Sequence, residues 1–194
     1  MSAKVPSAEN TGPRAVTAPA RAQLDDKAFD ELFRESAADV HAYAISLLGN
    51  RAAAEDLTAL AFERLYRARA RLDRGRGAPR AWLFAIARNA ALDELRRRSR
   101  QPQSELPEEM HDGGNAGEDA FEQLARRATV RDALAALPLR EREVVLLKFH
   151  GQLSNSELAK ALDVSESNAG TRLHRALTRL REKCNGLERE EEIA

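Results

Sequence analysis

The 194-residue chain is poor in the residues that stabilise small secreted or metal-dependent domains. Its one cysteine, Cys184, excludes an intrachain disulfide and suits a reducing compartment. The four histidines are scattered without ligand spacing, so we expect no structural zinc site and no other metal. Aromatic residues make up only 5% of the chain, which favours small helical domains over a β-sandwich.

Long apolar runs are also missing. The first 23 residues lack the apolar core of a signal peptide, and no segment is apolar over a bilayer-spanning length. We therefore expect a cytoplasmic protein without membrane insertion. The sequence also shows no nucleophile–base set, phosphate loop or metal-ligand set, so we expect neither an enzyme nor a cofactor.

Charge is balanced overall, with 31 basic and 31 acidic residues, but it is segregated along the chain. Residues 63–100 contain twelve arginines and four acidic residues, a net charge of +8. Residues 101–122 contain seven acidic residues and neither lysine nor arginine. This separation indicates a basic working surface with an acidic segment beside it.

The hydrophobic pattern is helical throughout, without β alternation. It predicts an all-α fold of two small helical domains joined by a flexible acidic linker, the C-terminal one with a helix-turn-helix. The predicted organisation is a disordered arm over 1–24, a first domain over 25–100, a linker over 101–120, a second domain over 121–185 and an acidic tail over 186–194. Helices are expected from Asp25 to the Gly49-Asn50 pair, over 52–70, over 79–98, and from Phe121 with breaks at Pro138, Gly151 and Asp163.

The predicted helix over 79–98 is apolar along most of its length and then runs into an arginine cluster. Only Arg88 and Asn89 interrupt the apolar stretch "WLFAIARNAAL". We expect a support helix that is buried all round and has a basic tip. Trp82 is expected in the core rather than as an exposed platform for base stacking.

The stretch "LSNSELAKALDVSESNAGTRLHRALTRLRE" predicts two short helices separated by a tight break. Ser154 and Glu157 have capping-box spacing, and Ser165 is placed to cap the second helix. Such a pair forms a helix-turn-helix, whose second helix enters the major groove of DNA. The polar face of that helix comprises Asn168, Thr171, Arg172, His174, Arg175 and Arg179. The alternative is a surface helix with a solvated charged face.

Two segments resemble a known family. "AEDLTALAFERLYRARARLDRGRGAPRAWLFAIARNAALDELRRRSR" resembles region two of the extracytoplasmic-function (ECF) sigma factors, the small promoter-recognition subunits of bacterial RNA polymerase. "ALAALPLREREVVLLKFHGQLSNSELAKALDVSESNAGTRLHRALTRLRE" resembles their region four. The resemblance spans about residues 26–184 and includes the order of the segments and the linker between them.

The resemblance implies an alternative sigma factor that binds core RNA polymerase through the β′ clamp helices and the β flap. Docking residues would be Glu55, Asp56, Thr58 and Leu60. Minus-ten DNA would be contacted by Arg74, Arg76, Asn89, Asp93, Arg96 and Arg97, with the loop over 72–79 capturing a flipped base. Minus-thirty-five DNA would be contacted by Gly170, Thr171, Arg172, His174 and Arg175. An anti-sigma factor would pack between the two domains, and the protein would be nucleoid-associated when in holoenzyme.

The sequence departs from the family's pattern in several places. Region two usually carries an acidic residue near Ala53. Ala59 and Leu60 replace a glutamine–acid pair in region two, which weakens docking or leaves Leu60 to make an apolar contact. One hypothesis is that phosphorylation of Thr58 restores the missing charge; it fails if Thr58→Ala activates transcription in vivo as well as the parent. In region four, Asn168-Ala169-Gly170 replaces a Thr-Val-basic triplet.

Two other functions remain open from the sequence. A helix-turn-helix regulator that is not a polymerase subunit would bind duplex DNA alone, as a dimer on paired half-sites. A protein that sequesters polymerase or a sigma factor would use both helical domains for protein binding, but it would leave the helix-turn-helix without a role.

Overall fold

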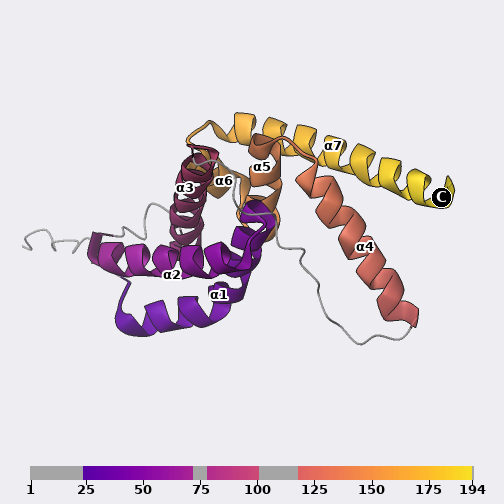
Figure 1. Cartoon of the computed structure of the whole chain (residues 1–194). Helices are drawn as coiled ribbons and strands as arrows, with labels where there is room; N and C mark the ends of the chain where they lie inside the picture. The colour runs from indigo at the N-terminus through magenta and orange to yellow at the C-terminus, as the bar shows by residue number, and fades with distance from the viewer. Residues whose placement is uncertain (1–23, 72–77, 101–117, 194) are drawn as a thin grey trace, which may run out of the picture.

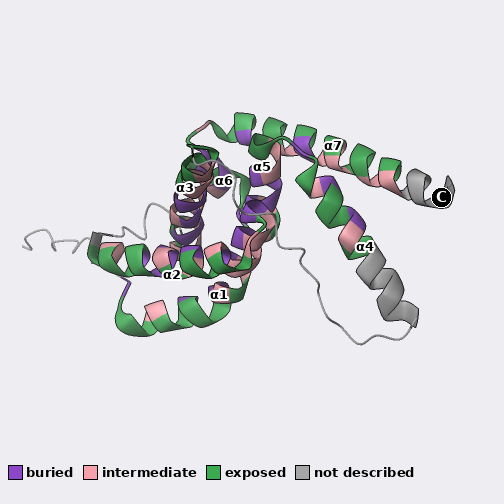
Figure 2. Ribbon diagram, viewed as in Figure 1, coloured by how far each residue is buried: buried purple, intermediate pink, exposed green. Residues whose placement is uncertain are grey.

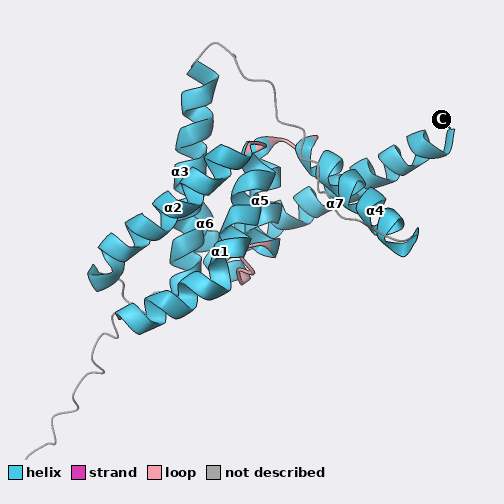
Figure 3. Cartoon of the chain, turned by 60° about the horizontal axis from the view of Figure 1, so that its bottom comes forward, coloured by secondary structure: helices cyan, strands magenta, loops and turns pink. Residues whose placement is uncertain are grey.

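The computed structural model describes residues 24–71, 78–100 and 118–193, and the described residues are helical without any strand (Figures 1 and 3). The α-helices are α1 (Asp26–Leu48), α2 (Arg51–Ala68), α3 (Pro79–Arg100), α4 (Glu118–Ala135), α5 (Leu139–Phe149), α6 (Asn155–Leu162) and α7 (Glu166–Ile193). A short 3₁₀ turn, η1 (Arg69–Arg71), follows α2. We call α1–α3 the first half and α4–α7 the second half. The all-α prediction is confirmed.

Local capping signals explain the sharp turn between α1 and α2. The Asp25 carboxylate accepts a hydrogen bond from the Ala28 backbone N–H at 2.8 Å and begins α1. Gly49 ends it in the left-handed conformation (φ +64°), where glycine carries no Cβ penalty. The Asn50 side chain then accepts from the Ala53 N–H at 2.8 Å and begins α2. The helices therefore pack as an antiparallel pair.

Helix α3 buries one side rather than its whole circumference, so the expectation of all-round burial is wrong. Its buried residues are Leu83, Phe84, Ala87, Ala90 and Ala91. Trp82 is 37% exposed, which corrects its placement in the core. The reason is geometric, because α1, α2 and α6 contact α3 on the side that carries Leu83 and Phe84, and the opposite side remains open.

The second half follows its predicted breaks. Pro138 precedes α5, Gly151 lies in the α5–α6 connection, and Asp163 takes the left-handed conformation (φ +54°) after α6. Helix α4 begins at Glu118, inside the predicted linker, and α7 continues to Ile193 through the segment predicted as an acidic tail. Figure 1 shows α4 and the C-terminal part of α7 extending away from the other helices.

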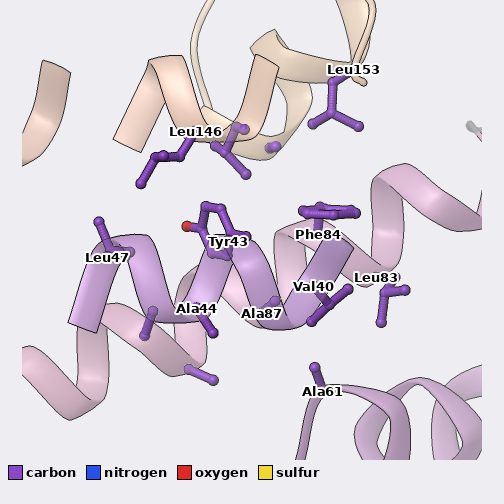
Figure 4. Close-up of a cluster of buried hydrophobic side chains, with 14 of the residues drawn as sticks. Val40, Tyr43, Ala44, Leu47, Ala61, Leu83, Phe84, Ala87, Leu146 and Leu153 are labelled. Atoms are coloured by element: carbon purple, nitrogen blue, oxygen red, sulfur yellow. The ribbon is translucent and has the colours of Figure 1, made fainter. Parts of the chain in front are cut away.

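The two halves share one hydrophobic core. Leu146 from α5 and Leu153 from the α5–α6 connection lie across from Tyr43 of α1 and Phe84 of α3 (Figure 4). Helix α3 also packs against α6, and α1 packs against α5. In Figure 2 buried residues accordingly gather where α1, α3, α5 and α6 meet. The predicted linker over 101–117 lies outside the described residues.

Candidate nucleic-acid interface

The predicted helix-turn-helix forms from α6 and α7. Ser154 and Glu157 make the reciprocal capping box: the Ser154 hydroxyl accepts from the Glu157 N–H at 3.3 Å, and the Glu157 carboxylate accepts from the Ser154 N–H at 2.9 Å. The Ser165 hydroxyl accepts from the Asn168 N–H at 3.3 Å at the start of α7. Both short-range signals therefore act as predicted.

Helix α7 has an inner apolar face and an outer polar face. Ala169 and Ala176 are fully buried, and Leu173 packs against the core. The predicted polar residues are all exposed: Asn168, Thr171, Arg172, His174, Arg175 and Arg179. This face is open for contact with a groove, as the amphipathic pattern indicated.

Internal contacts orient part of this outer face. The Arg172 guanidinium donates to the Asn168 side-chain oxygen at 2.9 Å, and the Thr171 hydroxyl donates to the Ser167 carbonyl at 2.9 Å. A Cβ added to Gly170 would meet no atom within 4 Å, so this position leaves open space on the helix surface.

The C-terminal end of α3 is basic but carries its own counter-charges. Arg96 donates to Asp93 at 3.1 Å, and both side chains are exposed. Arg97 and Arg98 both donate to Glu94 at 2.8 Å. The guanidinium of Arg97, helped by that of Arg98, lowers the pKa of Glu94 from 4.5 to about 2. Asn89, four residues before Asp93 on the same helix, is also exposed. The predicted residues Asn89, Asp93, Arg96 and Arg97 are therefore all accessible.

Other predicted residues on the first half differ in their accessibility. On α2, Glu55 and Asp56 are exposed, and Glu55 pairs with Arg51 at 3.0 Å. Leu60 is half-buried and packs against the core. The Thr58 hydroxyl is half-buried and donates to the Ala54 carbonyl at 2.7 Å. Arg74 and Arg76 lie outside the described residues.

Two arginines that sequence reasoning left without a role connect the halves. Arg80 donates to four oxygen atoms on α1 and on the α5–α6 connection, and Arg88 pairs with Glu143 of α5. A charged side chain that is buried on an otherwise apolar helix needs a partner of opposite charge. The apolar neighbours of Arg88 in the sequence could therefore have predicted an ion pair at this residue. Nothing in the local sequence named Glu143 as that partner.

Comparison with known proteins identifies the family. Sigma-70 region 2 matches residues 32–101, and sigma-70 region 4 matches residues 127–180. The ECF RNA polymerase sigma factor SigL of Mycobacterium tuberculosis is 30% identical over 161 residues, which cover 77% of this chain and 85% of SigL. The chain belongs to the ECF sigma factors of RNA polymerase.

A second relative also matches over most of its length. The RNA polymerase sigma factor CarQ of Myxococcus xanthus is 34% identical over 164 residues, covering 84% of this ECF sigma factor and 92% of CarQ. Family membership makes the chain an alternative sigma factor that acts in promoter recognition. It does not favour the regulator that works without polymerase.

Solved structures show the same fold. Sigma factor RpoE from Bartonella quintana, in complex with the anti-sigma factor NepR, superposes with a TM-score of 0.65 at 23% identity, covering 82% of this ECF sigma factor and 98% of RpoE. CnrH, in complex with the cytosolic domain of CnrY, gives a TM-score of 0.60 at 24% identity, covering 84% and 90%.

Within the described part of this ECF sigma factor, no helix is long and apolar enough to cross a membrane. The same residues contain no cluster of three or more His, Cys, Asp or Glu side chains that could hold a metal ion.

Proposed function

We propose that the two halves divide promoter recognition, with the domain boundaries expected from the sequence. The first half binds core polymerase and the minus-ten element, and the second half binds the minus-thirty-five element. The observation that carries this proposal is the presence of two separate accessible polar surfaces. One is the basic end of α3, inside the region 2 match, and the other is the outer face of α7, inside the region 4 match.

At the end of α3, the arginines attract the phosphates of the minus-ten DNA. Arg96 and Arg97 each have a carboxylate partner within one turn, Asp93 and Glu94. These pairs hold the guanidinium groups in place, and phosphate contacts can replace them. Asn89 and Asp93 then face the bases of the same element, together with the loop that carries Arg74 and Arg76.

At α7, the N-terminal half of the helix enters the major groove. His174 and Arg175 face base edges, Arg172 contacts a phosphate, and Thr171 contacts bases or phosphates. Gly170 contributes no side chain, so it allows the helix backbone to approach the DNA closely.

Polymerase docking uses the exposed acidic side of α2, with Glu55 and Asp56 facing the β′ clamp helices. Leu60 contributes through its accessible edge. Phosphorylated Thr58 would add charge to the same surface, but the phosphate would replace the hydroxyl's hydrogen bond to Ala54. The β flap contacts the second half.

An anti-sigma factor is the proposed inhibitory partner. Support comes from the likeness to RpoE and CnrH, which were solved with NepR and with the cytosolic domain of CnrY. We place the protein in the cytoplasm, nucleoid-associated in holoenzyme, and assign it no enzymatic activity of its own.

In vitro transcription from the gene's own upstream region tests the proposal. Core polymerase alone is compared with core plus the protein, and we expect a new discrete start. Arg96→Ala combined with Arg97→Ala should abolish that start, whereas the same changes at Arg127 and Arg131 on α4 should preserve it. Tight binding to duplex DNA without any start would instead favour the regulator that acts alone.

A further inference from the structure

The C-terminal turn of α3 carries four arginines within five residues, and two carboxylates precede them. The four residues, which we call the arginine tip, are Arg96, Arg97, Arg98 and Arg100. The carboxylates belong to Asp93 and Glu94 on the same helix. Neighbouring guanidinium groups repel one another, so the counter-charges decide how the arginines are arranged.

The Glu94 carboxylate binds two of these arginines at once. Arg97 donates from Nε to Oε2 and from Nη2 to Oε1, both at 2.8 Å, which makes a bidentate pair. Arg98 donates from Nε to Oε1, also at 2.8 Å. Charge-assisted bonds of this length are about twice as strong as neutral ones. Because Arg97 and then Arg98 lower the pKa of Glu94 to about 2, the carboxylate keeps its charge at neutral pH.

The two arginines point to different places. Arg98 is half-buried, and its Nη1 donates to the carbonyl of Leu48, the last residue of α1, at 3.2 Å. That carbonyl lies at a helix C-terminus, where a positive charge is favoured. The Arg97 side chain is instead 61% exposed. Glu94 therefore holds one guanidinium against α1 and the other at the surface proposed for minus-ten DNA.

The second acidic residue at the tip makes a weaker pair. Asp93 accepts a single hydrogen bond from Arg96 at 3.1 Å, and both side chains are exposed. Exposed pairs of this kind contribute little, because water competes for both groups. The Glu94 side chain is only 22% exposed, and both of its oxygens accept hydrogen bonds. A phosphate thus displaces Asp93 easily, whereas it has to compete with Glu94 for Arg97.

This competition matters because every DNA sequence offers the same phosphates. A guanidinium without a counter-charge binds phosphate on any DNA, and such non-specific binding draws the protein away from the promoter. A guanidinium that must first leave a carboxylate makes each non-specific contact weaker. At the minus-ten element, the base contacts proposed for Asn89 and Asp93 add free energy that other sequences do not supply. Weakening the contacts to wrong partners raises specificity even where it lowers affinity.

We propose that Glu94 is a positioning residue that makes the minus-ten surface selective: its carboxylate competes with DNA phosphates for Arg97 and thereby suppresses non-specific binding. The inference rests on the proposed function for its promoter consequence. The competition itself rests on the hydrogen bonds of Glu94, and it can be measured on DNA of any sequence.

The first measurement is the affinity of the free full-length protein for a duplex of arbitrary sequence, over a range of salt concentrations. Glu94→Gln keeps the size of the side chain but removes its charge. We expect this variant to bind the duplex several-fold more tightly than the parent, because one more guanidinium reaches a phosphate. Each added phosphate contact steepens the plot of log K against log salt concentration by about 0.9, so the slope should change by that amount.

Three variants separate competition for Arg97 from other effects. Glu31→Gln on α1 removes the same charge from an ion pair with Lys27, outside both proposed DNA surfaces, and should leave affinity and slope unchanged. Glu94→Asp keeps the charge on a shorter side chain and should bind the duplex as the parent does. Arg97→Ala removes the guanidinium for which Glu94 competes, so adding Glu94→Gln to it should bring no further gain.

The second measurement is initiation by core polymerase with each variant at the gene's own upstream region, with and without excess competitor duplex. Each transcript yield is expressed relative to that of the same variant without competitor. For Glu94→Gln this ratio should be several-fold lower than for the parent, because non-specific DNA retains more of the holoenzyme. Glu31→Gln should keep the ratio of the parent. Circular dichroism at neutral pH checks that every variant retains its helical content.

The outcomes separate the competition from its promoter consequence. Unchanged affinity and slope in Glu94→Gln overturn the inference, and so does an equal gain in Glu31→Gln, because the effect would then be one of net charge. A gain that persists in the Arg97→Ala background overturns the role of Arg97.

The promoter measurement has its own outcomes. Tighter duplex binding without greater sensitivity to competitor, relative to a parent that initiates, overturns the claim of selectivity. A parent that does not initiate with core polymerase refutes the proposed function and the promoter consequence with it. The duplex measurements still decide in that case whether Glu94 competes with phosphates for Arg97.

Discussion

Truncation of Phe84 tests whether the two halves share one core. The ring is fully buried, faces Tyr43 edge-on and lies 5.2 Å beneath the Arg80 guanidinium. Phe→Ala changes in cores cost about 3–5 kcal/mol, and aromatic pairs add about 0.5–1.5 kcal/mol beyond area burial. Because the site contacts rigid backbone at Gly151, it cannot collapse easily. We expect Phe84→Ala to lower the free energy of unfolding by about 4 kcal/mol.

The assay combines thermal unfolding with amide hydrogen exchange. At roughly 2–4 °C per kcal/mol for a chain of this size, the melting temperature should fall by roughly 8–16 °C. Exchange protection should fall in α5 and α6 as well as in α1 and α3, because Phe84 touches all of these segments or their connections. Phe149→Ala is the matched control: its side chain is 61% exposed, and surface changes cost within about 0.5 kcal/mol. A loss of protection confined to α1–α3 would refute a shared core.

Three further results are expected. Gly170→Ala should stabilise the protein by about 1 kcal/mol in thermal unfolding, because a helix gains from alanine and the added Cβ meets no atom within 4 Å. Gly170→Lys should steepen the salt dependence of promoter binding by about one unit; an unchanged slope would remove this helix face from the phosphates. Arg97 lowers the pKa of Glu94 from 4.5 to about 2, so this carboxylate stabilises the folded state above pH 4.5. That contribution is lost as the pH falls towards 2, so the parent should lose stability more steeply over this interval than Glu94→Gln, measured by denaturant midpoints.

Helix boundaries were predictable wherever a side chain satisfies a backbone group within a few residues. Three helices begin at a residue whose side chain accepts a hydrogen bond from the backbone N–H three residues later: Asn50, Ser154 and Ser165. Helix α1 ends at Gly49, which adopts the left-handed conformation without a Cβ penalty. Such signals depend only on neighbouring residues, so the sequence displays them fully.

Features that depend on distant partners were not predictable in the same way. Trp82 lies among apolar neighbours in sequence, yet its exposure is decided by which side of α3 faces α1, α2 and α6. The partner of Arg88 is 55 residues away, and the acceptors of Arg80 come from two other segments. In the candidate site, the exposed polar face of α7 could be predicted from the 3.6-residue period of its apolar residues. The ion pairs of Arg96 with Asp93 and of Arg97 with Glu94 became visible only in the structure.

The buried pair across the interface also constrains how the chain can be recombined. Arg88 and Glu143 lie in segments that match two separate family regions. A chimaera that joins residues 24–100 of this chain to a C-terminal part without an acidic residue at the position of Glu143 would keep a buried charge at position 88 without its complement. Domain exchange between family members therefore requires the two positions to be transferred as a unit, although each belongs to a different module.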